Sequence, residues 1–114
     1  WVQQVWIHDV EADADGTVRA ALVNRAFGDG IGLAFTWNKR QLPYLNQWKH
    51  TALGEYVTGI EPGNATVLGR VQNRTDGTLQ TLEPGETATF ELSIAVLDGA
   101  AAIDAFVARI GAEP

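Results

Sequence analysis

Hydrophobic and polar residues alternate over several short stretches of this chain, which is the pattern of half-buried β-strands. The clearest stretch is residues 87–97, where large apolar side chains occupy every second position from Phe90 to Val96. Shorter stretches of similar character, separated by turn residues, are residues 2–10, 17–24, 33–37, 56–60 and 79–82. The pattern therefore predicts an all-β fold, an antiparallel β-sandwich.

A helical period occurs near the end of the chain. The apolar residues spaced i, i+3, i+4 and i+7 there are Ile103, Phe106, Val107 and Ile110. We predict one C-terminal helix over residues 99–110, with Asp98 as its N-cap. A single helical turn around residues 67–71 is a further expectation, in an otherwise irregular and polar segment.

Acidic residues stand at alternate positions from Asp9 to Asp15, directly before Gly16. The spacing is similar to that of a calcium-binding loop. However, such a loop has a bidentate acid six residues after the glycine, and this chain has Leu22 there. We therefore interpret the segment as a hairpin turn at Asp15-Gly16, with residues 17–24 as the returning strand.

Composition narrows the possible classes of function. The chain has 114 residues, 46% of them hydrophobic, which suits a single globular domain, residues 1–114. A net charge of −6 argues against nucleic acids and anionic membranes as partners. No apolar run is long enough to span a bilayer. The chain lacks cysteine, so it has no disulfide or thiolate chemistry and is compatible with the cytoplasm, where we place it.

Two neighbouring stretches contain the residues best suited to catalysis or ligand binding. Glu61 follows the predicted strand 56–60 and precedes a Pro62-Gly63 turn, a position where a loop acid is held by a rigid scaffold. The alternative is an ordinary solvated acid before a turn. Residues 41–49 combine amides, aromatic rings and a cation, a combination of side chains that is suited to binding sugars. The alternative there is a half-buried strand with an aromatic stripe.

Four segments, in this order and spacing, resemble the C-terminal part of bacterial aldose 1-epimerase (galactose mutarotase)-like proteins. They are WIHDVEADADG (6–16), RQLPYLNQWK (40–49), YVTGIEPGN (56–64) and LEPGETATFELSI (82–94). The similarity is greatest to the subgroup of that superfamily known only as a domain of unknown function. It covers nearly the whole chain. Members are large antiparallel β-sandwiches, so the resemblance implies that this chain is the C-terminal portion of a longer protein.

The resemblance also implies a mechanism. Glu61 matches the catalytic base, and the general acid, a histidine, is expected upstream of this chain, so the role is not transferred to His8 or His50. The sequence departs from the family pattern directly after the glutamate, where Pro62-Gly63-Asn64 replaces a polar pair. We select Gln47, Trp48, Lys49 and Asn64 as substrate-contact candidates from chemistry and nearness in sequence. No metal or cofactor is expected.

Three functions remain as hypotheses for the parent protein. The first is interconversion of sugar anomers by general acid–base catalysis. The second is a non-catalytic carbohydrate-binding β-sandwich, and the third is a purely structural domain. The isolated chain is expected to be inactive, because the acid partner of Glu61 is absent from it. It is also expected to form homo-oligomers, because a truncated sandwich exposes strand edges and apolar faces such as that of Phe90, Leu92, Ile94 and Val96.

Overall fold

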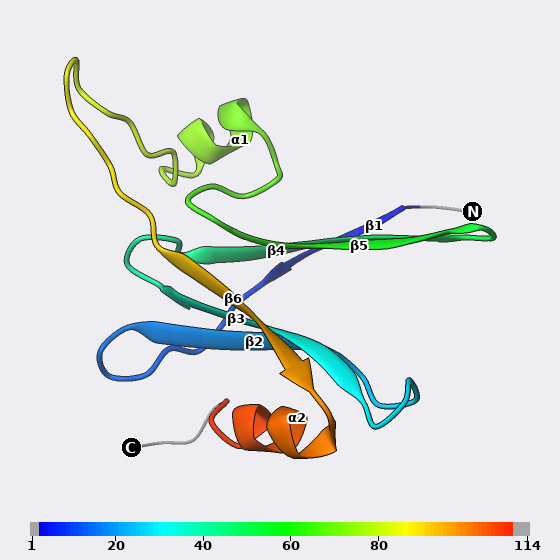
Figure 1. Cartoon of the computed structure of the whole chain (residues 1–114). Coiled ribbons are helices and arrows are strands. Elements are labelled where there is room, and N and C mark those ends of the chain that lie inside the picture. The colour runs from blue at the N-terminus through cyan, green and yellow to red at the C-terminus, as the bar shows by residue number, and fades with distance from the viewer. Residues whose placement is uncertain (1–2, 111–114) are drawn as a thin grey trace. The chain divides into compact units, whose positions relative to one another are not determined.

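The structure is a computed structural model that describes residues 3–110. The chain forms two compact units, each assembled from two separate segments (Figure 1). Unit 1 combines the start of the chain, up to Val10, with residues 41–90, and unit 2 combines residues 11–40 with the end of the chain from Glu91. Each unit contains one three-stranded sheet.

Unit 1 contains strands β1 (Gln4–His8), β4 (Tyr44–Ala52) and β5 (Glu55–Gly63), in the spatial order β1-β4-β5. Both pairings are antiparallel. A short helix, α1 (Arg70–Thr75), follows β5. The helical turn predicted around residues 67–71 therefore lies about one turn later in the sequence than expected.

Unit 2 contains strands β2 (Thr17–Asn24), β3 (Ile31–Asn38) and β6 (Leu92–Asp98), in the spatial order β2-β3-β6, and helix α2 (Ala100–Val107). Its strand pairs are again antiparallel. The predicted all-β class is thus confirmed, with two antiparallel sheets and a helix at the C-terminal end.

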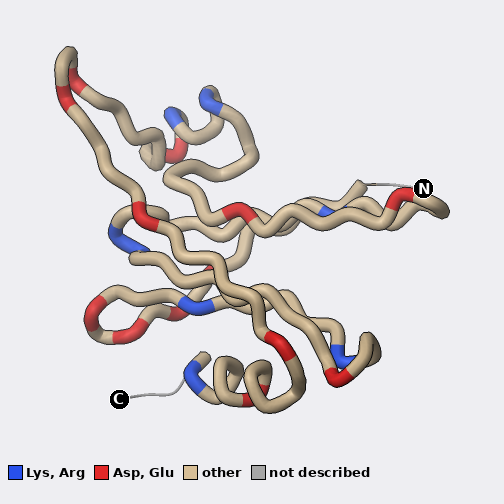
Figure 2. The backbone as a smooth tube through the Cα atoms, in the orientation of Figure 1, with Lys and Arg blue, Asp and Glu red and all other residues tan. Residues whose placement is uncertain are grey.

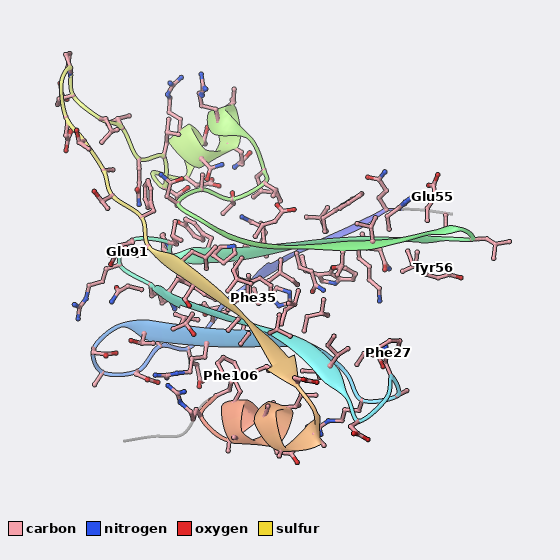
Figure 3. The ribbon with its side chains drawn as sticks, in the orientation of Figure 1. Phe27, Phe35, Glu55, Tyr56, Glu91 and Phe106 are labelled. Atoms are coloured by element: carbon pink, nitrogen blue, oxygen red, sulfur yellow. The ribbon has the colours of Figure 1, made fainter. Side chains whose placement is uncertain are left out.

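The core of unit 2 forms where α2 covers one face of its sheet. Ile103 of α2 is completely buried and packs with Ala34 of β3 and Leu97 of β6. Phe106 packs against this cluster from the same helix, and Figure 3 shows its ring between α2 and the sheet. A Cβ atom at Gly30 would lie 3.0 Å from the Ile103 Cδ1 atom, so this glycine makes room for the core.

The predicted hairpin at Asp15-Gly16 is wrong, because the two strands that flank this turn do not pair with each other. A tight turn does form there, with the Gly16 N–H donating to the Asp13 carbonyl at 2.8 Å. However, β1 pairs with β4 and β2 pairs with β3, so the segments on either side of the turn belong to different sheets. Alternation alone cannot choose a partner strand, because every strand of an antiparallel sheet offers the same backbone groups. Residue 2 of the predicted first strand lies outside the described residues.

Several element bounds also differ from prediction. Residues 79–82 form no strand, and the strand predicted over 87–97 begins only at Leu92. Helix α2 is shorter than residues 99–110, and Gly99 rather than Asp98 is its N-cap, without a side-chain capping bond. Asp98 is instead the last residue of β6, because the ladder with β3 extends to the pair Ile31–Asp98.

The sheet face of unit 2 opposite α2 is apolar across all its strands. Register places Leu22, Leu33 and Val96 in one row and Ala20, Phe35 and Ile94 in the next. Leu92, Ile94 and Val96 on the edge strand are 44%, 57% and 67% exposed. This is the face that we expected a truncated sandwich to expose, and self-association through it stays a prediction.

The Asp15 turn provides a pH-dependent prediction. The Thr17 backbone N–H donates to Asp15 Oδ1 at 2.9 Å, and this hydrogen bond lowers the pKa of the Asp15 carboxyl below its ordinary value of 3.8. Ionised Asp15 therefore stabilises the turn above that ordinary pKa, and the stabilisation is lost as pH falls through the folded-state pKa. A carboxyl NMR titration should find Asp15 titrating below 3.8. Asp15→Asn should remove this contribution, and a titration at or above the ordinary value would contradict the assignment.

Charge is spread along both units. Figure 2 shows acidic positions at intervals along the whole tube, consistent with 14 acidic against 8 basic residues. Within residues 3–110, no helix combines the length and apolar character needed to cross a membrane.

Candidate functional site

The β4–β5 hairpin of unit 1 holds the candidate residues. Its strands are joined by a two-residue turn whose second residue, Gly54, has a φ of 83°, a value that suits glycine. Because the turn is this short, it fixes the register of the ladder, which runs from the pair Ala52–Glu55 through Asn46–Glu61 to Tyr44–Gly63.

Glu61 shares one face of this sheet with a row of β4 side chains. Its direct cross-strand neighbour is Asn46, and Trp48 and His50 follow at alternate positions along β4. Directly opposed residues on antiparallel strands have Cβ atoms about 4.5–5.5 Å apart. The hairpin therefore gathers a carboxylate, an amide, an indole and an imidazole on one face.

Glu61 lies within β5, which continues through Pro62 to Gly63. The prediction that the strand ends at residue 60, with a Pro-Gly turn after it, is therefore wrong. β5 is an edge strand, where a proline is tolerated because its missing N–H leaves no ladder bond unmade. Glu61 is exposed, and its backbone is held by the β4–β5 ladder rather than by a loop.

The Glu61 side chain lies back along its own strand, over Gly59. A Cβ atom built on Gly59 would fall 2.3 Å from Glu61 Oε1, so the carboxylate occupies space that any other residue at 59 would fill. Gly59 is the cross-strand partner of Trp48. The carboxylate therefore lies over the β5 residue that pairs with Trp48, on the sheet face that Trp48 shares.

Trp48 and His50 form a stacked aromatic pair. Their rings are stacked, with centroids 6.0 Å apart and planes 7° from parallel. The indole Nε1–H donates to Gln3 Oε1 at 3.1 Å, and His50 Nδ1 lies 3.4 Å from Glu55 Oε2. Figure 3 shows Glu55 and Tyr56 on opposite sides of β5, the alternation that puts Glu55 on the Glu61 face. We call Trp48 and His50 the aromatic shelf.

The structure separates the predicted contact residues. Trp48 joins Glu61, but Gln47 and Lys49 lie on the opposite face of β4, because successive residues of a strand point to opposite sides. Gln47 Oε1 lies 3.0 Å from His8 Nε2, and its Nε2 lies 3.5 Å from the Thr58 hydroxyl, so its amide is engaged on that face. The two residues therefore do not share a face with the Glu61 carboxylate.

Asn64, the remaining predicted contact, directly follows β5 and is half-buried. Sequence reasoning missed Asn46, which is only 5% exposed. Its Nδ2 donates to the Ala65 carbonyl at 3.1 Å, and its buried Oδ1 has no hydrogen-bond partner among residues 3–110. The signal that could have found Asn46 is the short turn at Gly54, since counting outward from it pairs Asn46 with Glu61.

The family described as "Domain of unknown function (DUF4432)" matches residues 1–96 of the chain. The chain belongs to this family. The match extends from the start of the chain into β6 and includes the whole β4–β5 hairpin. No curated protein and no solved structure matches the chain. The family description names no activity and does not connect the DUF4432 chain to aldose 1-epimerases, so that resemblance stays a prediction.

A buried asparagine organises the loop of the DUF4432 chain that follows the hairpin. Asn73 is 2% exposed, and its Nδ2 donates to the carbonyls of Thr66 and Gly69. Its Oδ1 accepts from the Thr66 N–H and from the hydroxyls of Thr66 and Thr78. Asn73 therefore fixes the segment that begins at Ala65, the acceptor of the Asn46 hydrogen bond.

Replacing Asn73 with alanine is expected to destabilise this loop by about 1–3 kcal/mol, because buried partners lose their hydrogen bonds. Amide hydrogen exchange should accelerate at Thr66, Thr78 and Leu79. The N–H groups of Thr78 and Leu79 donate to the backbone carbonyl of Asn73, so they report on the order of this loop. Gln72→Ala, which removes an exposed amide one position earlier, serves as the matched control. Equal exchange in both variants would contradict the role given to Asn73.

No group of three or more histidine, aspartate or glutamate side chains that could hold a metal ion occurs within the described residues of the DUF4432 chain. On the Glu61 face, the chemistry available is that of a carboxylate acceptor, an amide and flat aromatic rings. An aromatic face receives the C–H side of a sugar ring, while carboxylate and amide oxygens accept from its hydroxyl groups.

Proposed function

We propose that the parent protein of this DUF4432 chain binds a sugar and interconverts its anomers, in the manner of an aldose 1-epimerase. The observation that supports this best is the position of the Glu61 carboxylate over Gly59, the cross-strand partner of Trp48, on the same sheet face as the aromatic shelf. A sugar ring stacked on Trp48 would present its edge hydroxyl groups to that carboxylate. The proposal includes a cytoplasmic location, with which the lack of cysteine is compatible.

The reaction requires one base and one acid. Ionised Glu61 accepts the proton of the anomeric hydroxyl while an acid donates a proton to the ring oxygen, and the bond between the anomeric carbon and the ring oxygen breaks. Rotation about the bond between the first two carbons turns the aldehyde, and reversal of the proton transfers closes the ring as the other anomer. No electrons are gained or lost, and the protons balance over the cycle.

Glu61 suits the role of base because its backbone is fixed while its carboxylate is accessible. The β4–β5 ladder holds the backbone of the strand, and the lack of a side chain at Gly59 leaves room for the carboxylate. Positioning of this kind is what general base catalysis needs, and it contributes about 10²–10⁴-fold per group. We propose that this chain is the C-terminal part of a longer sandwich and that the acid lies in the remaining part.

A non-catalytic carbohydrate-binding module is the second candidate. One observation favours it: Glu61 is exposed on an edge strand, and an exposed carboxylate beside an indole is also a good hydrogen-bond acceptor for a bound sugar. In that case the aromatic shelf would bind the sugar and no bond would break.

A sugar panel tests both candidates in the longer parent protein. Aldoses of several classes are titrated while tryptophan fluorescence is followed, and anomer exchange is measured by NMR or polarimetry. Binding with accelerated exchange supports the epimerase, and binding with exchange at the spontaneous rate supports the binding module. If no sugar changes the spectra or the exchange rate, both candidates are wrong.

A further inference from the structure

An exposed surface of unit 1 combines apolar side chains with two arginines. Val67 and Leu68, in the turn before α1, and Val71, within α1, are 47%, 59% and 79% exposed. Arg70 and Arg74 are one helical turn apart, so their Cβ atoms lie about 5–6 Å from each other on the surface of α1. We call these five residues the arginine patch. Figure 2 shows two basic positions on α1.

The backbone that carries the arginine patch is well ordered. Asn73 is 2% exposed, and its Nδ2 donates to the carbonyls of Thr66 and Gly69. These two carbonyls flank the turn that contains Val67 and Leu68. Apolar side chains that cluster on a soluble protein's surface mark interaction sites, and a backbone that is already ordered lowers the entropy cost of binding.

The two arginines carry uncompensated positive charge in an acidic protein. Across residues 3–110, neither the Arg70 nor the Arg74 guanidinium takes part in an ion pair. The chain as a whole has 14 acidic residues against 8 basic ones. Guanidinium groups form strong paired hydrogen bonds with carboxylates. The arginine patch therefore complements a surface that presents carboxylates beside apolar groups.

Unit 1 contains such a surface a few residues further along the chain. Glu83 and Glu86 are exposed and lie at the ends of a tight turn, in which the Glu86 N–H donates to the Glu83 carbonyl at 2.9 Å. Glu86 Oε2 also accepts from the Glu83 N–H at 2.8 Å. The end residues of such a turn have Cα atoms less than about 7 Å apart. Leu82, directly before it, is 57% exposed, and residues 75–108 contain no lysine or arginine. We call residues 82–86 the acidic turn.

We infer that the arginine patch of one copy binds the acidic turn of a second copy, so that the protein forms a dimer. The two surfaces match in charge and in spacing, because two guanidinium groups one helical turn apart meet two carboxylates at the ends of a four-residue turn. Exposed apolar side chains flank the charges on both surfaces. The net charge of −6 on each copy repels at long range. Salt at 0.1 M screens that repulsion beyond about 10 Å, whereas the paired groups act at contact.

The position of the two surfaces within unit 1 favours a closed dimer. The N–H groups of Thr78 and Leu79 donate to the Asn73 carbonyl at 2.9 and 3.0 Å, so the segment that leads to the acidic turn starts beside α1. A two-fold arrangement can therefore make the contact twice, with each copy offering its patch to the other's turn. Making both contacts at once matters, because a single exposed ion pair contributes little.

Charge reversal tests the dimer in the longer parent protein. One variant reverses the patch (Arg70→Glu with Arg74→Glu), and another reverses the turn (Glu83→Arg with Glu86→Arg). All four side chains are exposed, so the fold should be kept. Each variant alone should have a dimer dissociation constant raised at least about 10-fold, because like charges then face each other. An equal mixture of the two should form a heterodimer, because opposite charges face each other again. Sedimentation equilibrium measures these constants.

Controls outside the two surfaces show whether the effect is local. Arg40→Glu with Arg109→Glu reverses two exposed cations elsewhere and should leave the dissociation constant unchanged. Val71→Ser should weaken the dimer about 5-fold, through the apolar contact that it loses. Leu53→Ser, at a side chain that is 94% exposed in the β4–β5 turn, should have no effect.

Three results would overturn the inference. The first is a parent protein that stays monomeric. The second is a dimer that neither charge reversal weakens, since another surface, such as the apolar sheet face of unit 2, then joins the copies. The third is a pair of reversed variants that stay apart when mixed. None of these measurements involves a sugar, so the outcome is independent of the proposed function.

Discussion

Replacing Glu61 with glutamine is expected to slow anomer exchange in the longer parent protein by about 10²–10⁴-fold. Glutamine keeps the length and the hydrogen-bonding capacity of the side chain, but it cannot accept the anomeric proton. Sugar binding should therefore persist while the catalysed rate falls. NMR exchange spectroscopy measures the rate, and tryptophan fluorescence measures the binding.

Glu86→Gln is the matched control, because Glu86 is an exposed acid of the same unit whose carboxylate accepts only from the Glu83 N–H of its own turn. A companion variant, Gly59→Ala, tests position rather than chemistry: the new methyl group would meet Glu61 Oε1 and displace the carboxylate. It should also lower the rate with Glu61 still present. An undiminished rate in Glu61→Gln, with sugar still bound, would remove Glu61 from the mechanism.

Replacing Ile103 with alanine is expected to destabilise unit 2 by about 2–5 kcal/mol, the range for truncating a buried isoleucine. Ile103 is completely buried and joins α2 to the sheet through Ala34 and Leu97. The loss combines the removed apolar contacts with the cavity left behind. Urea denaturation followed by circular dichroism, with hydrogen exchange in β3 and β6, reports the change.

Val107→Ala is the control for this prediction, because Val107 lies on the same helix but is 40% exposed. Its truncation removes less buried surface and should cost less than about 1 kcal/mol. If the two variants lose equal stability, α2 does not hold unit 2 through Ile103. Hydrogen exchange distinguishes loss of the helix alone from loss of the whole sheet.

The candidate site was only partly predictable from the sequence. Glu61 and Trp48 were selected, and the structure does bring them to one face. Gln47 and Lys49 were selected because they are close to Trp48 in sequence, but nearness in sequence is misleading in a strand, where adjacent residues lie on opposite faces. Asn46 and His50 were missed for the same reason.

The sequence also did not predict which strands pair with each other. β1 pairs with β4, whose residues lie more than thirty positions away in the sequence, as in the pair His8–Leu45. The intervening chain forms β2 and β3, which belong to the other sheet. The tight turn at Gly16 could suggest a hairpin from local chemistry, but the choice of partner depends on which apolar faces each strand must bury.

The sequence by itself determined the all-β class, the C-terminal helix and the bounds of β2, because alternation, helical period and turn residues are local properties of the chain. It did not determine that Glu61 lies within a strand, since the predicted strand ended at residue 60 and β5 continues to Gly63. Only the tertiary structure decided which side chains share the Glu61 face, since cross-strand register sets that face. It likewise decided that Asn46 is buried and that its Nδ2 donates to the Ala65 carbonyl, because burial and hydrogen bonding depend on segments that are distant in sequence.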